Sequence, residues 1–157
     1  CVHHAFADNS ARNLPDQLIM KKMDTGFRGN ATFEMEGIMK WNQKLASLDG
    51  FVFVVSEYNH SISASLKNAL DLAKEAWNNK AAGIVSYGSA YGARAAEHLR
   101  GILGELQIAD VRTQVLLSLF TDFDGSGNFK PMELHKTNVS SMVTQLINWS
   151  KALKTIR

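Results

Sequence analysis

Phe51-Val52-Phe53-Val54-Val55 decides the fold, because all of these consecutive residues are β-branched or aromatic. An apolar run without polar alternation predicts a strand that is covered on both faces, as in a parallel sheet. Asp49-Gly50 before the run is a turn signal. After a short polar stretch, apolar residues at helical spacing predict a helix with Ser61 or Ser63 as its N-cap: Ile62, Leu66, Ala69, Leu70, Ala73, Ala76 and Trp77.

The same strand and helix unit recurs along the chain. Residues 82–86 predict a second buried strand, a glycine-punctuated loop follows, and the spacing predicts a helix over 93–106. Within residues 111–119, apolar positions alternate with more polar ones, which is typical of a strand at a sheet edge. A last helix is expected around 139–153. Strands that alternate with helices predict a three-layer α/β sandwich with a parallel sheet.

The beginning of the chain is harder to interpret. Residues 2–6 are a candidate strand, whereas 13–16 and 24–30 have the composition of loops. Apolar residues within 35–48 predict a helix that leads into the first clear strand, and their spacing assigns Met35 and Met39 to the core. We therefore expect one domain over 1–157, with 1–33 poorly assigned.

Composition and charge exclude several classes of protein. The chain has 157 residues, 45% of them hydrophobic, and a net charge of 17 − 15 = +2. This interspersed balance gives no electrostatic reason to expect nucleic acid or an anionic membrane as a partner. No apolar run approaches the ~18 residues of a membrane span, and one cysteine excludes an internal disulfide. With no visible secretory signal, we expect a cytoplasmic protein.

Two loops follow the first two predicted strands and concentrate polar and aromatic groups. One spans 57–61 and the other 86–92. Since ligands of parallel α/β sheets bind at the carboxyl ends of strands, both loops are expected at one edge. Glycine backbones and tyrosine faces there suit a planar heteroaromatic ring, whereas a triphosphate is disfavoured because the chain has no GxxxxGK[ST] loop. The alternative is that both loops serve only as turns and helix caps.

The residues of these loops resemble a known family. Ser56-Glu57-Tyr58-Asn59-His60-Ser61-Ile62, followed by Leu66-Lys67-Asn68-Ala69-Leu70-Asp71, resembles the PEYNxSxPxxLKNAID signature of the NAD(P)H-dependent FMN reductases. Ser86-Tyr87-Gly88, with Gly92-Ala93-Arg94-Ala95 and Glu97-His98-Leu99-Arg100, resembles the SYGxxGGxRAxEHLR stretch of the same family. The resemblance covers about 36–157 and implies a flavodoxin-like fold.

The resemblance also implies a chemistry. The family binds FMN without a covalent link, and passes a hydride from NADPH (or NADH) to the flavin and on to free flavin, a quinone or an azo compound. Since the flavin performs the redox step, no protein side chain is expected to be catalytic and no metal ligand is implied. The resemblance further implies a homo-oligomer, either a dimer or a tetramer. The FMN-binding residues that it implies are Glu57, Tyr58, Asn59, His60 and Ser61 in the first loop, Ser86, Tyr87, Gly88 and Gly92 in the second, and Arg94 in support.

The sequence departs from the family pattern in three ways. Ser56 and Ser63 stand where the family has proline, which loosens the first loop. Ala93 stands where the family usually has glycine, and it would tolerate a positive φ poorly. The family's opening strand and its Gly-Ser-x-Arg phosphate loop have no clean copy, so we expect weak FMN binding. The strand at 51–55 would then lack its central neighbour, unless residues 2–6 or a partner chain fill the place, or the chain is a fragment.

Two other interpretations remain. A catalytically defective flavodoxin-like relative would keep the fold and act as a binding or interaction domain. Alternatively, the stretch from Asp122 to Glu133 matches the EF-hand calcium loop in its oxygen-bearing positions and in its glycine at position six, Gly127. A strand rather than a helix is expected before this stretch, and there is one such loop where EF-hands pair. An acidic turn after an edge strand is therefore the preferred interpretation.

Overall fold

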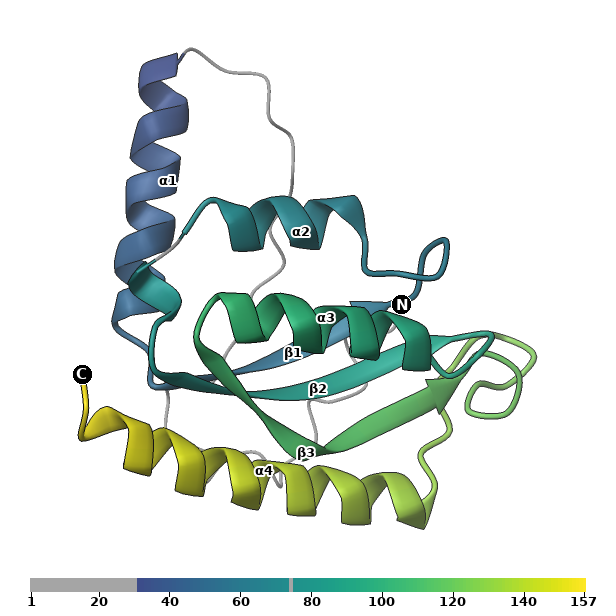
Figure 1. Ribbon diagram of the computed structural model, residues 1–157. Helices are drawn as coiled ribbons and strands as arrows, with labels where there is room; N and C mark the ends of the chain where they lie inside the picture. Colours follow the sequence, from purple (N-terminus) through teal and green to yellow (C-terminus); the bar gives the residue numbers. More distant parts are fainter. Residues whose placement is uncertain (1–30, 74) are drawn as a thin grey trace.

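The computed structural model describes residues 31–73 and 75–157 and shows an α/β architecture (Figure 1). Within this part of the chain, β1, β2 and β3 form a parallel sheet in sequence order. In order, the elements are α1 (Ala31–Ala46), β1 (Gly50–Ser56), α2 (Ala64–Asp71), the short 3-10 helix η3 (Glu75–Trp77), β2 (Lys80–Gly88), α3 (Ala93–Glu105), β3 (Ile108–Ser118) and α4 (Glu133–Lys154). The predicted parallel α/β fold is confirmed, while the candidate strand at 2–6 lies outside the described residues.

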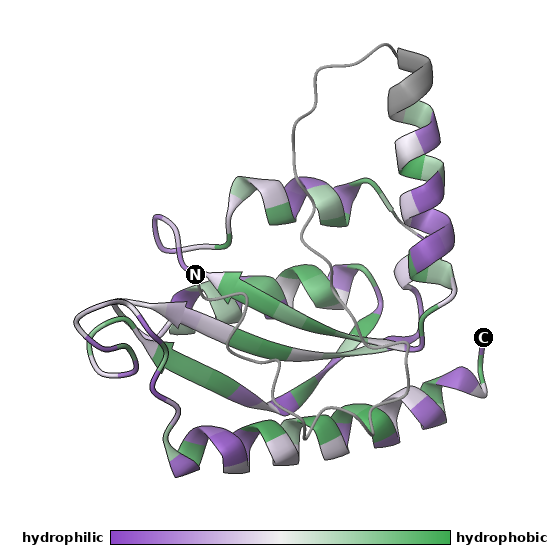
Figure 2. Cartoon of the chain, turned by 180° about the vertical axis from the view of Figure 1, so that it is seen from behind, coloured by the Kyte–Doolittle hydropathy of each residue, from purple (hydrophilic) through white to green (hydrophobic). Residues whose placement is uncertain are grey.

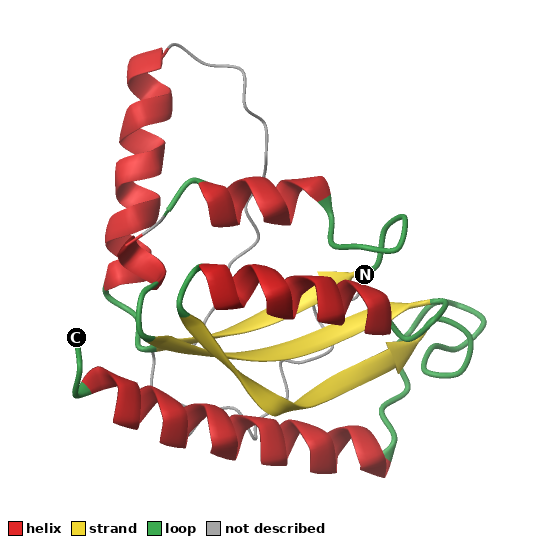
Figure 3. Cartoon of the chain, viewed as in Figure 1, coloured by secondary structure: helices red, strands yellow, loops and turns green. Residues whose placement is uncertain are grey.

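Helices cover the sheet in two separate layers (Figure 3). On one face, the core joins Phe51 and Phe53 of β1 to the apolar sides of α2 and α3. On the other face, Met142 and Leu146 of α4 pack against Val85 and its buried neighbours on β2 and β3. Figure 2 shows the resulting distribution, with hydrophobic residues on the strands and hydrophilic ones on the outer sides of the helices. None of the helices in 31–73 and 75–157 combines the length and apolar character needed to cross a membrane.

Strand β1 differs from the prediction of a strand covered on both faces. Phe51, Phe53 and Val55 are buried, but Val54 on the opposite face is 43% exposed. The reason is that β1 is an edge strand in the described sheet, and α4 packs mainly over β2 and β3. The strand with buried side chains on both faces is β2, which lies between the other two.

The helix expected over 62–77 is interrupted. Ser63 is the N-cap of α2, and its hydroxyl accepts a hydrogen bond from the Leu66 N–H at 3.3 Å. Helix α2 ends at Asp71, and the chain resumes as η3, which places Trp77 in the core. The Trp77 indole donates to the Leu70 carbonyl at 3.0 Å. Burying this indole with a satisfied N–H requires the turn between the two helices.

Helix α1 corrects a second prediction. Met35 and Met39, which the spacing assigned to the core, are 61% and 58% exposed. Only the C-terminal part of α1 packs on the body, through buried Leu45 and a hydrogen bond from the Trp41 indole to the Ala69 carbonyl at 3.0 Å. The rest of the helix projects beyond α2 (Figure 1). The apolar pattern correctly predicted a helix, but the burial of its apolar side chains depends on which elements pack beside them.

Candidate functional site

The two polar loops lie side by side at the carboxyl edge of the sheet. Parallel pairing of β1 with β2 sets Ser56 opposite Tyr87, so both strands end at the same level. The Glu57 N–H continues this pairing and donates to the Tyr87 carbonyl at 3.0 Å. A Cβ added at Gly88 would approach the Glu57 Cβ to 3.0 Å, which shows how closely the loops pack. The predicted juxtaposition is therefore present in the structure.

The first loop contains a tight turn. Tyr58 and Ser61 exchange backbone hydrogen bonds of 2.9 Å in both directions. Between them, Asn59 and His60 have φ angles of 46° and 72°, the left-handed pair that defines a type I′ turn. Glycine is usual at the second of these positions, so a histidine there is held by the surrounding bonds. The turn leaves the Tyr58 ring 63% exposed.

The second loop depends on Gly92 rather than on the residue after it. Tyr91 and Gly92 have φ angles of 60° and 70°, whereas Ala93 begins α3. A Cβ at Gly92 would lie 2.6 Å from the Tyr87 backbone nitrogen, so the loop folds tightly over the end of β2. Ala93 therefore does not need the positive φ that an alanine would tolerate poorly. The chain turns one residue earlier, where a glycine is available.

Glu57 and Arg94 connect the first loop to α3. The Arg94 Nε donates to Glu57 Oε1 at 2.6 Å, and the Glu57 side chain is only 4% exposed. The Arg94 guanidinium is the main reason that the pKa of Glu57 lies below its ordinary value, and the backbone N–H groups of Arg94 and Ala95 add to the effect. Oε2 is buried without a hydrogen bond among the described residues. Glu57 is thus a buried anion beside the start of α3, and its contact with Arg94 joins the first loop to that helix.

The edge offers hydrogen-bond donors and flat apolar faces. The backbone N–H groups of Asn59, His60, Ser89 and Ala90 donate to no other group in the described part of the chain. Tyr91 is 47% exposed at this edge. The carbonyl and nitrogen edge of a planar heteroaromatic ring needs such donors, and its faces need such apolar surfaces.

Three further residues that were predicted to bind FMN lie in different surroundings. Tyr87 is half-buried and packs toward the α4 side of the sheet, so its ring is less available than that of Tyr91. Ser86 is buried and its hydroxyl donates to the Tyr91 carbonyl at 3.2 Å, which stabilises the second loop. Ser61 faces α3, where its hydroxyl lies 3.0 Å from the His98 Nδ1. The hydroxyls of Ser86 and Ser61 are therefore bonded to other groups of the protein, in the second loop and on α3 respectively.

A third loop, after β3, joins the same edge and was missed by sequence reasoning. The Leu119 N–H donates to the Gly88 carbonyl at 3.2 Å, and Leu119 and Phe120 are 48% and 76% exposed. The alternation over 111–119 predicts Leu119 within the strand, but β3 ends at Ser118. The available signal was that two large apolar residues follow the last buried position of a strand and precede an acidic turn.

The acidic stretch after Phe120 is held inward. The Asp122 carboxylate is buried, accepts the Ser118 N–H at 2.6 Å and lies 3.5 Å from the His135 Nε2. Asp124 accepts the N–H groups of its own turn, and Glu133 at the start of α4 pairs with Lys136 at 3.2 Å. The oxygen ligands of the calcium-loop pattern thus face different neighbours, and no cluster of three metal-binding side chains occurs in 31–73 or 75–157.

Two shallow hollows border the first loop on the side of α2 and α3. One is lined by residues of the turn and the start of α2, including Tyr58, Asn59 and Ser63. The other lies between α2 and α3 and includes Ser61 and His98. The first loop therefore contributes to two surfaces, the carboxyl edge of the sheet and the groove between two helices.

Comparison with solved structures supports the fold. The chain is similar to the flavoenzyme NAD(P)H:(acceptor) oxidoreductase FerB from Paracoccus denitrificans, with a TM-score of 0.62 and 17% identity over 79% of this chain and 74% of that one. It is also similar to an oxidoreductase from Corynebacterium diphtheriae, with a TM-score of 0.61 and 16% identity over 74% and 63% of the two chains. At these identities the similarity shows the flavodoxin-like fold alone.

Sequence comparison defines the family. An NAD(P)H-dependent FMN reductase of Schizosaccharomyces pombe is 39% identical over 94 residues, 60% of this chain and 47% of that protein. An NADPH:quinone oxidoreductase of Arabidopsis thaliana is 34% identical over 113 residues, 63% of this chain and 57% of that protein. The chain thus spans about half the length of these curated relatives. The family model for NADPH-dependent FMN reductases matches residues 9–122, and the chain therefore belongs to this family.

Proposed function

We propose that this chain binds FMN at the carboxyl edge of the sheet and acts as an NAD(P)H-dependent oxidoreductase. The observation that carries the proposal is the Glu57 N–H to Tyr87 carbonyl bond of 3.0 Å, which brings two family motifs together at one edge. Relatives are named FMN reductases and quinone oxidoreductases, which supports the same chemistry. When bound, the flavin would accept a hydride from NADPH or NADH and pass electrons to an acceptor.

The described residues fit the ring of the flavin. The unengaged N–H groups of Asn59, His60, Ser89 and Ala90 would meet the oxygens and nitrogens at the ring edge. Tyr58 and Tyr91 would cover apolar parts of the ring and exclude water from the hydride path. Gly88 and Gly92 would allow a close approach to the backbone, and the pair of Glu57 with Arg94 would hold both loops in position.

Binding of the FMN phosphate can be separated from binding of the flavin ring. The expected loss of the family's phosphate loop concerns residues before 31, which lie outside the described part of the chain. Our prediction of weak FMN binding therefore stands on the sequence alone. It can be separated from ring binding by comparing FMN with riboflavin, which has the same ring and no phosphate.

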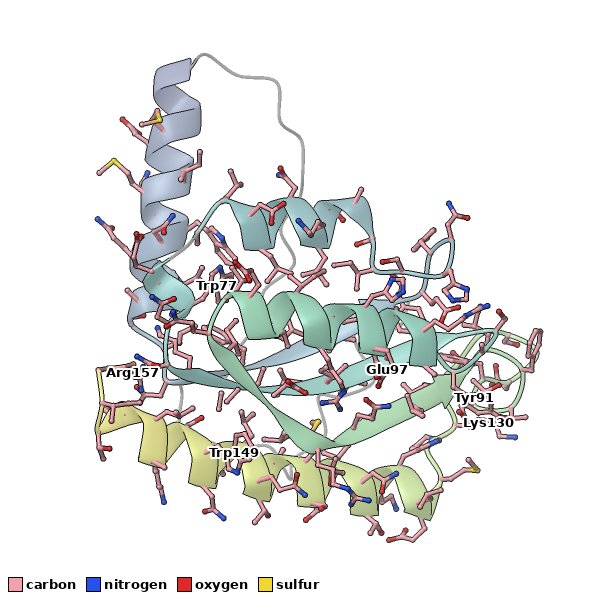
Figure 4. The ribbon with its side chains drawn as sticks, viewed as in Figure 1. Trp77, Tyr91, Glu97, Lys130, Trp149 and Arg157 are labelled. Carbon is pink, nitrogen blue, oxygen red and sulfur yellow. The ribbon has the colours of Figure 1, made fainter. Side chains whose placement is uncertain are left out.

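The test is a fluorescence titration of both flavins with the full chain. We expect the chain to quench FMN and riboflavin to a similar extent, with little gain from the phosphate. The double variant Tyr58→Ala and Tyr91→Ala should weaken the binding of both flavins at least about tenfold, because each exposed ring contributes stacking of about 1 kcal/mol. Trp149→Ala is the matched control, since Trp149 is 47% exposed on α4 (Figure 4).

Two outcomes would contradict the proposal. If the fluorescence of neither flavin is quenched up to its solubility limit, a ring site is excluded. Equal losses in the tyrosine and Trp149 variants would place the ring elsewhere.

Turnover is then measured as FMN-dependent oxidation of NADPH and of NADH with a quinone or an azo compound as acceptor. We further expect a cytoplasmic protein that forms a homo-oligomer, a dimer or tetramer. Size-exclusion chromatography with light scattering would measure the oligomeric state.

A further inference from the structure

Two histidines face each other beside the first loop. His60 lies at the tip of the type I′ turn, and His98 lies on α3, 38 positions further along the chain. Their ring centres are 5.9 Å apart and the ring planes are inclined by 51°. Both side chains are exposed, so solvent reaches the space between the rings. The flavin proposal does not use either ring.

The spacing of the two rings suits a shared metal ion. Two imidazoles that each bind one tetrahedral Zn²⁺ at about 2.0–2.1 Å have ring centres roughly 5–6 Å apart. The His98 Nδ1 is already oriented by the Ser61 hydroxyl at 3.0 Å, which leaves Nε2 as the free nitrogen. A metal-bound histidine ordinarily donates its other ring N–H to an oxygen acceptor, which fixes its tautomer and orientation. The Ser61 hydroxyl is placed to accept that hydrogen bond.

The charges around the hollow that His98 lines favour a cation over an anion. The hollow next to Ser61 and His98 is bordered by three carboxylates, Asp71, Glu97 and Glu105. Its one lysine, Lys67, is held by Asp71 at 2.7 Å, so that positive charge is compensated. Glu97 lies 3.6 Å from Arg100 and remains 70% exposed. A phosphate group would meet net negative charge here, whereas a divalent cation would meet a favourable field.

The backbone at His60 provides a further argument. Its φ of 72° is a conformation that glycine adopts freely and other residues adopt at a cost of about 1–2 kcal/mol. The turn itself therefore does not need the imidazole, and strain of this kind is typical of functional positions.

We propose that His60 and His98 bind a divalent transition metal ion, with Zn²⁺ as the best match, through one ring nitrogen of each. Within 31–73 and 75–157 no third histidine, cysteine or carboxylate completes the set, so water fills the remaining positions. Such an open, two-ligand site is weaker than a structural zinc site with four protein ligands. His98 lines the hollow between α2 and α3, and the proposed site uses ring nitrogens only, so it does not engage the backbone N–H groups of the turn.

The test is a calorimetric titration of zinc chloride into the full chain at neutral pH. His60→Gly, which also suits the positive φ, and His98→Ala should each lose one equivalent of bound Zn²⁺. Because both rings share one ion, the double variant should lose the same single equivalent as either variant alone. Cys1, His3 and His4 are unchanged in every variant, so zinc held there cancels from the comparison. Circular dichroism without zinc confirms that each variant is folded.

A second measurement identifies the ligands directly. Long-range proton–nitrogen NMR of the imidazoles should show that zinc shifts the Nε2 resonance of His98 and one ring nitrogen of His60 together, with the same dependence on zinc concentration. An unchanged number of equivalents in both single variants would overturn the proposal. So would losses that add in the double variant, because they would indicate two independent sites.

Discussion

Arg94 at the start of α3 donates from Nε to the Oε1 of Glu57 at 2.6 Å and thereby joins the loop after β1 to the helix after β2. The partners differ in exposure, since the carboxylate is 4% exposed and the guanidinium 43%. Removing the Arg94 side chain and neutralising the Glu57 carboxylate should therefore change the free energy of unfolding by different amounts.

Removing the arginine should cost more than neutralising the glutamate. Arg94→Ala leaves an unpaired buried carboxylate, and we expect a loss of about 2–4 kcal/mol in the free energy of unfolding. Glu57→Gln leaves an arginine that water can reach, and the expected loss is about 1 kcal/mol. Urea unfolding measures both values. Asp71→Asn in the exposed pair with Lys67 is the control, with a change within about 0.5 kcal/mol. The reverse order for Arg94 and Glu57 would contradict this account.

The same pair predicts a loss of stability in acid. The pKa of Glu57 is lowered in the folded state, chiefly by Arg94, from an ordinary value of 4.5. Its contribution is therefore complete above pH 4.5 and disappears as the pH falls through the lowered folded pKa. Unfolding free energies of the parent chain and Glu57→Gln should converge over this range. If the difference between them stayed constant down to pH 3 or below, Glu57 would not be the titrating group.

Gly92 should tolerate no side chain. Gly92→Ala combines a φ of 70° with a Cβ placed 2.6 Å from the Tyr87 nitrogen, and we expect a loss of about 3 kcal/mol or more with weaker flavin quenching. Gly101→Ala is a matched control in α3, where an added Cβ meets nothing within 4 Å. There the higher helix propensity of alanine should add about 0.5–1 kcal/mol. Thermal unfolding distinguishes the two, and a stable Gly92→Ala would refute the tight loop.

Lys80 predicts a gain of stability in alkali. This buried lysine, which donates to the Leu45 carbonyl, has its pKa lowered by burial from 10.5 to about 8. Between these values the unfolded chain binds more protons than the folded one, so stability rises with pH. Relative to Lys80→Met, the parent chain should gain about 2–3 kcal/mol from pH 8 to pH 10.5. Parallel curves for the two proteins would show that the lysine titrates normally.

Phe120 should contribute to ligand binding and not to the stability of the fold. It is 76% exposed on the loop that Leu119 ties to Gly88, so Phe120→Ala should change stability by less than about 0.5 kcal/mol. If this loop borders the flavin edge, the variant should bind flavin or a quinone acceptor several-fold more weakly. Leu134→Ala, at a 62% exposed position on α4, is the control for removing an exposed apolar side chain. Equal binding by both variants would remove the third loop from the proposed site.

The sequence alone determined the order of the elements and the two loops of the candidate site. The apolar run at 51–55, the recurring helical spacing and a serine cap at Ser61 or Ser63 are local patterns, and parallel strands bring consecutive loops to one edge by topology. The structure selects Ser63 as the cap. Tertiary structure decided what depends on neighbours. Val54, Met35 and Met39 are exposed because no described element covers them, and Gly92 turns because the end of β2 lies against it. The pairs of Glu57 with Arg94 and of His60 with His98 join residues 37 and 38 positions apart, and no local pattern specifies such contacts.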